Sequence, residues 1–184
     1  MKMNGSEVIA APRDAVWAGL NDPAVLKQCI PGCDSITKDS PTSMTAKASI
    51  KLGPLKVPFK GTVTLSNIKA PESYHISGQG QGGLAGFASG GAAVKLTAIS
   101  AEETQLDYDV DAQVGGKMAM LGSRLIDSTA QSLAKQFFAK FATAVKAQAA
   151  TAPKQSAAPK KAAPKKTTKA AAKKVVKKAG KKKK

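Results

Sequence analysis

The sequence has few residues that could bind a metal ion or form disulfides. Its 184 residues include only two cysteines, Cys29 and Cys33, and one histidine, His75. A structural zinc site needs four nitrogen or sulfur ligands, and these three side chains cannot supply them. We therefore interpret the cysteines, which flank a Pro-Gly turn in CIPGC, as free reduced thiols, and we expect no metal site.

Long apolar runs are also missing. No stretch reaches the roughly 18 apolar residues that a membrane-spanning helix needs, and the start, MKMNGSEVIA, has no apolar signal-peptide core. We expect a cytoplasmic protein that does not cross a membrane.

Acidic residues are absent from the end of the chain. Of the 29 lysines and arginines, 14 lysines follow residue 150, whereas all 12 acidic residues precede it, so the first 150 residues have a net charge of only about +3. We predict a folded domain over residues 1–150. Residues 151–184, here called the polybasic tail, are rich in lysine, alanine and proline, a composition that favours disorder in isolation.

Apolar and polar residues alternate along much of the predicted domain. In MTAKASIKL the apolar residues from Met44 to Leu52 occupy every second position. The same period of two recurs at 55–59, 63–65, 74–76, 94–98 and 106–114. This pattern is typical of antiparallel strands that bury one face and expose the other.

Helical patterns frame these strands. Short helices are expected after Pro12 and over 24–28, and a helix of about 30 residues with one broad apolar face is expected after Gly115 and Gly116. The order of a strand, two short helices, about six strands and a long helix predicts an α+β domain. In it, one curved antiparallel sheet wraps around the C-terminal helix.

The residues expected on the inner face of this sheet are small. They include several alanines, aromatic residues make up only 4% of the chain, and the segment GQGQGGLAGFASGG adds glycines. Because protein interiors are closely packed, small residues on a curved sheet indicate either close contact with the helix or a cavity. We predict a hydrophobic cavity, with a closed sheet-on-helix core as the alternative.

Candidate catalytic groups are few. Asp107, Asp109 and Asp111 share one strand face, but they are spaced nearly 7 Å apart, and pairing with outward lysines such as Lys95 explains them as well. His75 is expected on the outer face, and the GxGxxG match that begins at Gly78 is not followed by a helix. No enzyme constellation is recognised, and we predict a protein that is not an enzyme.

Four separated motifs carry a resemblance to a known family. In order, they are AVWAGLNDPAVLKQCIPGC, GPLKVPFKGTVTLSNI, PESYHISGQGQGG with GFASGGAAVKL, and YDVDAQVGGKMAMLGSRLID. Over residues 1–145 the chain resembles the CoxG subunit of carbon monoxide dehydrogenase, a family of the START-like helix-grip (SRPBCC) superfamily.

The resemblance implies a helix-grip fold with a hydrophobic tunnel between the sheet and the C-terminal helix. It also implies a non-enzymatic partner of a molybdenum hydroxylase of the carbon monoxide dehydrogenase type. Such a partner recruits the enzyme to the inner face of the cytoplasmic membrane and carries a respiratory quinone or another lipophilic small molecule, with no other cofactor. A helix-grip enzyme acting on a hydrophobic small molecule is the alternative. The expected cavity lining comprises Phe59, Tyr74, Phe87, Leu96, Tyr108, Met118, Leu121, Leu125 and Ile126.

The polybasic tail has two candidate partners. Anionic lipid attracts lysines near a membrane surface, and nucleic acid attracts them through counterion release, as in the linker-histone-like tails that this segment resembles. We favour an anionic membrane surface, because a nucleic-acid-binding protein would not need the cavity. The expected contacts are made by Lys160, Lys161, Lys165, Lys166, Lys173, Lys174, Lys177 and Lys178.

Overall fold

The computed structural model describes residues 1–53 and 55–151. The predicted membrane-binding lysines of the polybasic tail lie outside the described residues. In chain order the elements are β1 (Lys2–Ile9), α1 (Arg13–Leu20), α2 (Pro23–Cys29), β2 (Cys33–Ser40), β3 (Ser43–Leu52), β4 (Leu55–Lys69), β5 (Ser73–Gln81), the 3₁₀ segment η1 (Gly83–Ala85), β6 (Phe87–Ala98), β7 (Thr104–Gly115), the 3₁₀ segment η2 (Gly116–Leu121) and α3 (Ser123–Thr151).

Seven strands form one antiparallel sheet in the order β1-β7-β6-β5-β4-β3-β2. Strands β2 to β7 each pair with the next one along the chain, and β1 returns to pair with β7 from Lys2 opposite Asp111 to Ile9 opposite Thr104. The two edges of the sheet are therefore β1 and β2. The segment with α1 and α2 carries the chain from one edge to the other.

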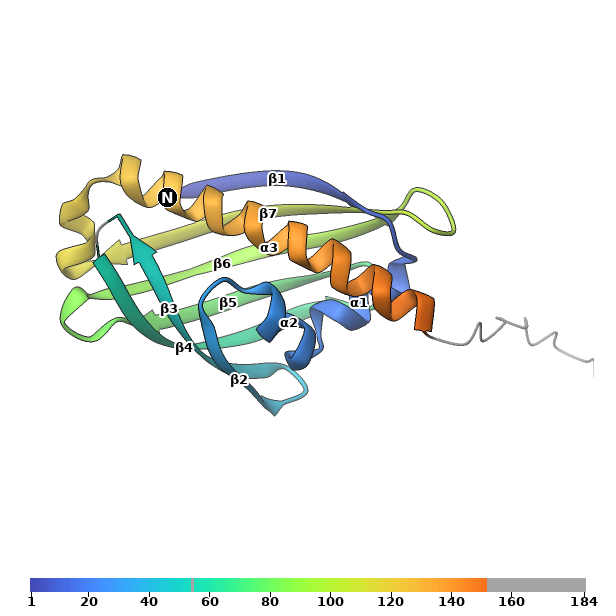
Figure 1. Ribbon diagram of the computed structural model, residues 1–184, viewed down its shortest axis with the longest axis horizontal. Helices are drawn as coiled ribbons and strands as arrows, with labels where there is room; N and C mark the ends of the chain where they lie inside the picture. Colours follow the sequence, from blue (N-terminus) through green and yellow to red (C-terminus); the bar gives the residue numbers. More distant parts are fainter. Residues whose placement is uncertain (54, 152–184) are drawn as a thin grey trace, which may run out of the picture. The chain divides into compact units, whose positions relative to one another are not determined.

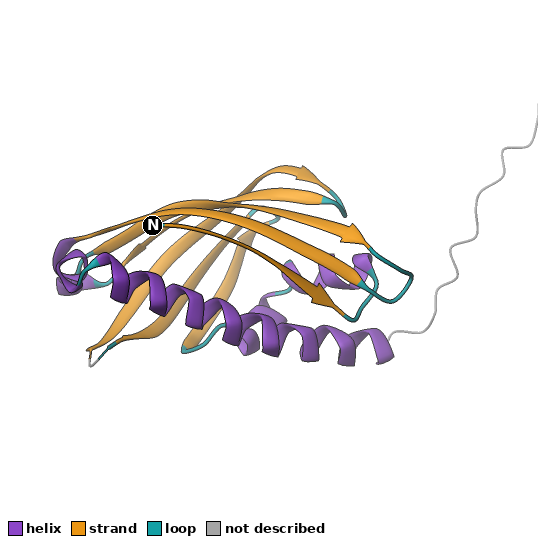
Figure 2. Cartoon of the chain, turned by 90° about the horizontal axis from the view of Figure 1, so that it is seen from above, coloured by secondary structure: helices purple, strands orange, loops and turns teal. Residues whose placement is uncertain are grey.

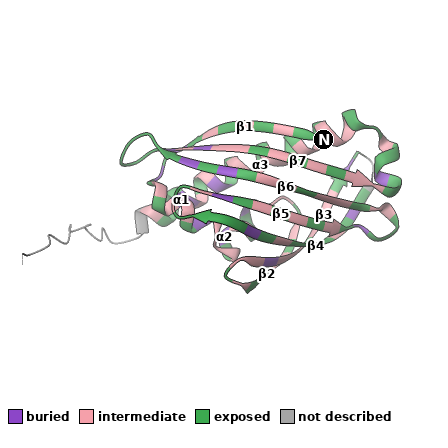
Figure 3. Cartoon of the chain, turned by 180° about the vertical axis from the view of Figure 1, so that it is seen from behind, coloured by how far each residue is buried: buried purple, intermediate pink, exposed green. Residues whose placement is uncertain are grey.

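The long helix α3 runs along the concave side of the curved sheet (Figures 1 and 2). Exposed residues alternate with more buried ones along strands such as β1 and β5 (Figure 3), as the sequence pattern predicts for strands with one wet face. This arrangement is the helix-grip α+β fold, and it confirms the fold predicted from the sequence.

The start of the long helix differs from the prediction. The helix was expected directly after Gly116, but residues 116–121 form η2 and α3 begins at Ser123. Gly122 between them has φ +85°, a left-handed conformation that an α-helix cannot include and that glycine adopts without strain. The helical spacing of the apolar residues in this segment therefore comes from a 3₁₀ turn that is separate from α3.

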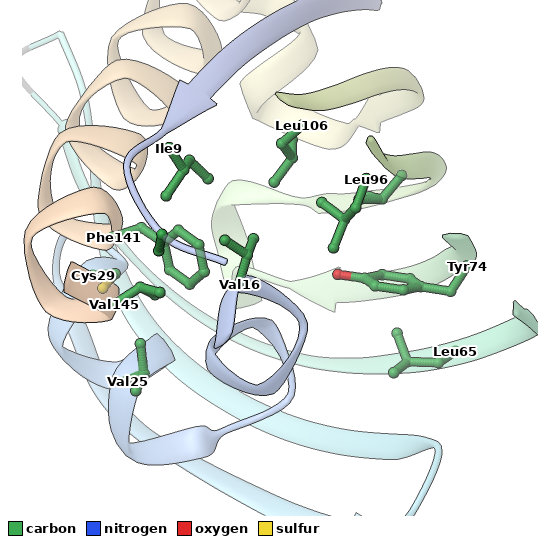
Figure 4. Packing of buried hydrophobic residues seen from close by; sticks show 12 residues of the cluster. Ile9, Val16, Val25, Cys29, Leu65, Tyr74, Leu96, Leu106, Phe141 and Val145 are labelled. Carbon is green, nitrogen blue, oxygen red and sulfur yellow. The ribbon is translucent and has the colours of Figure 1, made fainter. Parts of the chain in front are cut away.

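Two clusters of buried side chains hold the domain together. The main core lies between α1, the C-terminal half of α3 and the sheet, and centres on Val16, Phe141 and Val145 (Figure 4). At Gly19 of α1, a side chain would meet Val145 Cγ2 at 2.7 Å, so glycine permits the close approach of the two helices. The second cluster, here called the end cluster, consists of Leu52, Val57 and Met118 with the partly buried residues around them.

The fully buried Thr104 links β7 to the corner between β1 and α1. Its hydroxyl donates a hydrogen bond of 2.8 Å to the Ala11 carbonyl. We expect Thr104→Val to lower the free energy of unfolding by about 1–3 kcal/mol, because the buried carbonyl loses its partner. Urea unfolding monitored by circular dichroism measures this. The exposed Thr97 on the neighbouring strand provides the control, since Thr97→Val should change stability little, and an equal effect of both substitutions would contradict the assignment.

Candidate functional site

An apolar cavity of about 290 Å³ lies between the sheet and the helices. The inward-facing residues of β2 to β7 form one wall, and the ends of α1 and α2 and the C-terminal half of α3 form the other. The cavity is lined by Leu20, Leu26, Ile30, Ile36, Met44, Ala46, Val63, Leu65, Tyr74, Ile76, Val94, Leu106, Phe137 and Phe138. Fourteen apolar or aromatic side chains that surround one space make a site for an apolar molecule.

Small residues on the inner face of the sheet accompany this space. Ala46 of the lining stands opposite Gly61, and Gly61 stands opposite Gly80 on the next strand. A Cβ atom added at Gly78 would meet only the Thr62 carbonyl oxygen and Val63 Cγ2 within 4 Å, and neither belongs to α3. The helix therefore does not pack against the sheet at Gly78. The sequence predicted a cavity, with a closed sheet-on-helix core as the alternative, and the structure contains the cavity.

Tyr74 is the only cavity-lining residue with a polar side-chain atom. It is 5% exposed, its ring meets the ring of Trp17 edge-on at 5.2 Å, and burial raises the pKa of its hydroxyl far above the ordinary value. Figure 4 shows the hydroxyl among the aliphatic side chains of Val16, Leu65 and Leu96. None of the side-chain hydrogen bonds found in the described residues involves this hydroxyl, and no fully enclosed side-chain oxygen there lacks a partner, so its oxygen keeps access to open space. A neutral hydroxyl of this kind is a hydrogen-bond donor available to a bound molecule.

An apolar surface groove of about 370 Å³ adjoins this cavity. The two share Ile30, Phe137 and Phe138, and the groove extends along α3 toward Met3 and Val110 on β1 and β7. The shared residues make the two spaces neighbours under the same helix. Together they offer room for a compact group in the cavity and for an attached chain in the groove.

The structure brings only part of the predicted lining into the cavity. Tyr74 lines it, Leu96 is buried in the main core beside it, and Tyr108 stacks on the lining residue Phe138 with ring centroids 5.2 Å apart. Phe59, Met118 and Leu121 instead belong to the end cluster. Met118, 2% exposed, fills that end of the sheet-helix space, so the tunnel end that we expected beside Gly115 and Gly116 is closed by side chains.

Three further residues of the predicted lining lie elsewhere. Phe87 is 51% exposed, and its ring covers Gly115 on the outer face of the sheet. Leu125 and Ile126 lie half-buried in the first turn of α3, far along the helix from Phe137 and Phe138, and they do not line the cavity. These assignments are corrected because the first turn of α3 lies away from Phe137 and Phe138, and because Phe87 faces outward.

The sequence analysis did not predict the contributions of α2, β2 and the middle of α3. Leu26, Ile30 and Ile36 come from a segment that we considered only for a short helix, turns and thiols. Phe137 was assigned only to the apolar face of the long helix, and Phe138 was assigned no role. The adjacent pair of phenylalanines was an available signal, because two neighbouring helix positions point in different directions and can face both the core and a cavity.

The outer face of the sheet carries the groups that we weighed for catalysis. Asp107 stands opposite Lys95, and hydrogen bonds from Gln105 and Ser6, together with the Lys95 charge, lower the pKa of its carboxyl. Asp111 lies 3.8 Å from the Lys2 ammonium. Lysine pairing thus accounts for two members of the aspartate row. Within residues 1–53 and 55–151, no three acidic, histidine or cysteine side chains converge closely enough to hold a metal ion.

Both cysteines are free thiols beside α2. Cys29 is fully buried in the main core, and burial raises the pKa of its thiol against the opposing charge of Lys140. Burial and the charge of Asp34 likewise raise the pKa of the Cys33 thiol. A raised pKa lowers the thiolate fraction near neutral pH, so both thiols are weak nucleophiles, and Cys29 serves as a packing residue of the main core.

None of the described helices is long and apolar enough to cross a membrane.

Comparison with solved structures supports the fold and adds one close similarity. A conserved protein from Geobacillus kaustophilus is 32% identical to the chain, with a TM-score of 0.76 over 80% of this chain and 97% of that protein. A START superfamily protein from Mycobacterium smegmatis is 12% identical, with a TM-score of 0.64 over 80% and 98%. The Zhui aromatase/cyclase from Streptomyces sp. R1128 is 16% identical, with a TM-score of 0.52 over 82% and 93%.

No curated protein matches the chain significantly. A protein-family model does match, and its match covers nearly the whole described domain. The family is that of the CoxG subunit of carbon monoxide dehydrogenase, and the match extends over residues 5–146. Because the match covers more than half of the chain, the chain belongs to the CoxG family.

Proposed function

We propose that the protein is a non-enzymatic accessory protein that binds a respiratory quinone in its apolar cavity. In this proposal it brings a molybdenum hydroxylase of the carbon monoxide dehydrogenase type to the inner face of the cytoplasmic membrane. The name of the family supports the partnership. The observation that carries the ligand is the apolar cavity whose lining has a single hydroxyl, that of Tyr74.

The size of the cavity supports a ligand with one or two rings. An engineered apolar cavity of about 150 Å³ is known to hold benzene, and the cavity here, at about 290 Å³, has nearly twice that volume. A naphthoquinone or benzoquinone head fits this limit. A prenyl chain would continue into the adjoining groove of about 370 Å³ past Phe137 and Phe138.

The chemistry of the cavity supports a head group with a hydrogen-bond acceptor. A plain hydrocarbon would leave the Tyr74 hydroxyl unpaired, whereas a quinone carbonyl accepts the bond that the protein does not supply. The site is therefore better matched to a quinone than to an aliphatic chain.

An enzyme acting on a hydrophobic molecule is the second candidate, since the fold is shared with an aromatase/cyclase. Acid–base catalysis needs a group that titrates near the working pH. Tyr74 is the only titratable side chain in the cavity lining, and burial raises its pKa far from neutrality. We therefore favour the carrier over the enzyme.

The direct test of the ligand is extraction of the protein purified from a quinone-containing bacterium, followed by native mass spectrometry. We expect a quinone at a substantial fraction of one per chain, released by organic solvent. Recovery of phospholipid or fatty acid without quinone would contradict the proposed ligand while leaving an apolar-ligand carrier. Recovery of no ligand, together with failure to bind added quinone, would contradict the carrier itself.

Tyr74→Phe tests the polar contact. We expect about 3- to 10-fold weaker binding of menadione, a quinone without a prenyl chain, because one hydrogen bond contributes roughly 0.5–1.5 kcal/mol. The stability of the ligand-free protein should not fall, since the hydroxyl has no partner to lose. Quenching of Trp17, the single tryptophan, reports binding because its ring contacts Tyr74.

Two comparisons make this result specific. Tyr108→Phe removes the hydroxyl of the other tyrosine, which does not line the cavity, and should leave menadione binding unchanged. Methylnaphthalene, which lacks acceptor oxygens, should bind the wild type and the Tyr74→Phe variant alike. Equal menadione affinity of the Tyr74→Phe variant and the wild type would remove the role assigned to the hydroxyl.

A further inference from the structure

The most exposed large apolar side chains of the described domain lie on its two 3₁₀ segments. Leu84 of η1 is 90% exposed and Met120 of η2 is 84% exposed. The other exposed large hydrophobic residues are only 43% to 59% exposed. Nearly complete exposure of two such side chains is costly in water, so a partner that covers them is expected.

The two segments meet through glycines that leave no room for side chains. A Cβ atom at Gly116 would lie 2.6 Å from the Gly86 Cα atom, and one at Gly86 would collide with the Gly115 carbonyl oxygen. Gly86 and Gly116 also have positive φ angles of 124° and 75°. The loops are thus joined at their bases, and Leu84 and Met120 project from one end of the domain, here called the apolar tip (residues 82–86 and 116–121). In Figure 1 this end lies opposite the end of α3.

Basic residues surround the apolar tip. Lys56 and Lys117 line a surface hollow of about 460 Å³ together with Leu84 and Met118. In sequence, residues 50–60, 82–90 and 114–126 contain Lys51, Lys56, Lys60, Lys117 and Arg124, and the first acidic residue after them is Asp127 in α3. The acidic residues of β7, in contrast, lie on the outer face of the sheet.

We propose that the apolar tip docks on an anionic lipid bilayer, with Leu84 and Met120 entering the interface and Lys56 and Lys117 contacting headgroups. Exposed apolar side chains flanked by lysines are the pattern of interfacial membrane binding. This contact rests on the membrane recruitment in the proposed function and names a surface for it that is separate from the cavity and from the polybasic tail. The structure assigns the tip a lipid surface by charge complementarity and by exposed aliphatic side chains.

Vesicle binding by the full chain tests the proposal. Leu84→Ser/Met120→Ser is compared with Val8→Ser/Ile99→Ser, which removes two exposed hydrophobic residues away from the tip without changing the charge. Partition onto vesicles of phosphatidylcholine and phosphatidylglycerol is measured over a salt series. We expect the tip variant to bind roughly tenfold more weakly at every salt concentration, with the salt dependence unchanged because all lysines are retained. The control variant should follow the wild type.

A depth measurement complements this result. Leu84→Trp should be quenched by brominated acyl chains in the same vesicles, whereas the half-buried Trp17 of the wild type should not. Equal partition of the tip variant and the wild type, or no quenching of the new tryptophan, would overturn the proposal.

Self-association is the alternative use of the tip. A wild type that dimerises without lipid, together with a monomeric tip variant and unchanged vesicle binding, would assign the tip to self-association instead. The purified tip variant should retain the ligand bound in its cavity. Loss of the docking proposal would therefore leave the proposed ligand binding intact, and the two failures can be distinguished.

Discussion

Ala46→Trp is expected to abolish binding of the apolar ligand. Ala46 faces the cavity from β3, between Ile36 on one neighbouring strand and Gly61 on the other, and no larger side chain stands beside it on β4. An indole at this position would occupy much of the volume of about 290 Å³. We expect no ligand to be recovered from the purified variant and at least about 100-fold weaker menadione binding, since a filled cavity cannot admit a ring.

The control for this substitution lies on the same sheet. Ala93→Trp places the same indole on the exposed outer face of β6 and should leave the ligand in place. Filling a cavity can itself cost about 1–3 kcal/mol through strain, so urea unfolding of both variants must show that Ala46→Trp is folded under the binding conditions. A folded Ala46→Trp variant that still contains one quinone per chain would place the ligand outside this cavity.

The fold could be predicted from the sequence because each strand has one wet and one buried face. The alternation at Met44 to Leu52, for example, becomes a strand in which Met44 and Leu52 are buried and Lys47 and Lys51 are exposed. Such alternation depends only on the spacing of residues along one strand, so it can be recognised without knowing which strand pairs with it. The order of the elements then leaves few arrangements for one sheet and one long helix.

The position of the cavity could not be predicted in the same way. Apolar residues at helical spacing from Met118 to Ile126 look the same in sequence whether they line a space or fill it. Here Met118 fills one end together with Leu52 and Val57, and the space remains at the other end beside Phe137 and Phe138. Which end of the space between the sheet and α3 stays empty depends on how side chains from distant elements pack together. A local sequence pattern does not contain this information.

The error at Phe87 is of another kind, because the sequence contained the information to avoid it. Val94 and Leu96 face inward on β6, so a period of two places Ala88 inward and Phe87 outward. The assignment followed the size of the residue instead of its position in the register. Extending the register of the inward residues through the glycines would have excluded Phe87 from the lining.

Removal of the polybasic tail, by truncation after Ala150, is expected to weaken binding to anionic vesicles at low ionic strength by at least about 100-fold. The truncation removes 14 lysines and no acidic residue, and each lysine near an anionic surface contributes roughly 1 kcal/mol before screening. The main core, which extends along α3 as far as Val145, stays intact, so we expect the shortened protein to fold and to retain ligand. Flotation with vesicles and thermal unfolding measure the two effects.

The choice between lipid and nucleic acid as the partner of the polybasic tail depends on competition, because both attract lysines and both release the protein as salt rises. Full-length protein held on anionic liposomes is challenged with duplex DNA at equal charge concentration. We expect most of the protein to remain on the liposomes, since the apolar tip adds a contact that only the bilayer can satisfy. The Leu84→Ser/Met120→Ser variant should then shift toward DNA, because only electrostatic attraction remains. Transfer of most wild-type protein to DNA, with localisation on the chromosome in cells, would reject the membrane assignment of the tail and support a linker-histone-like role.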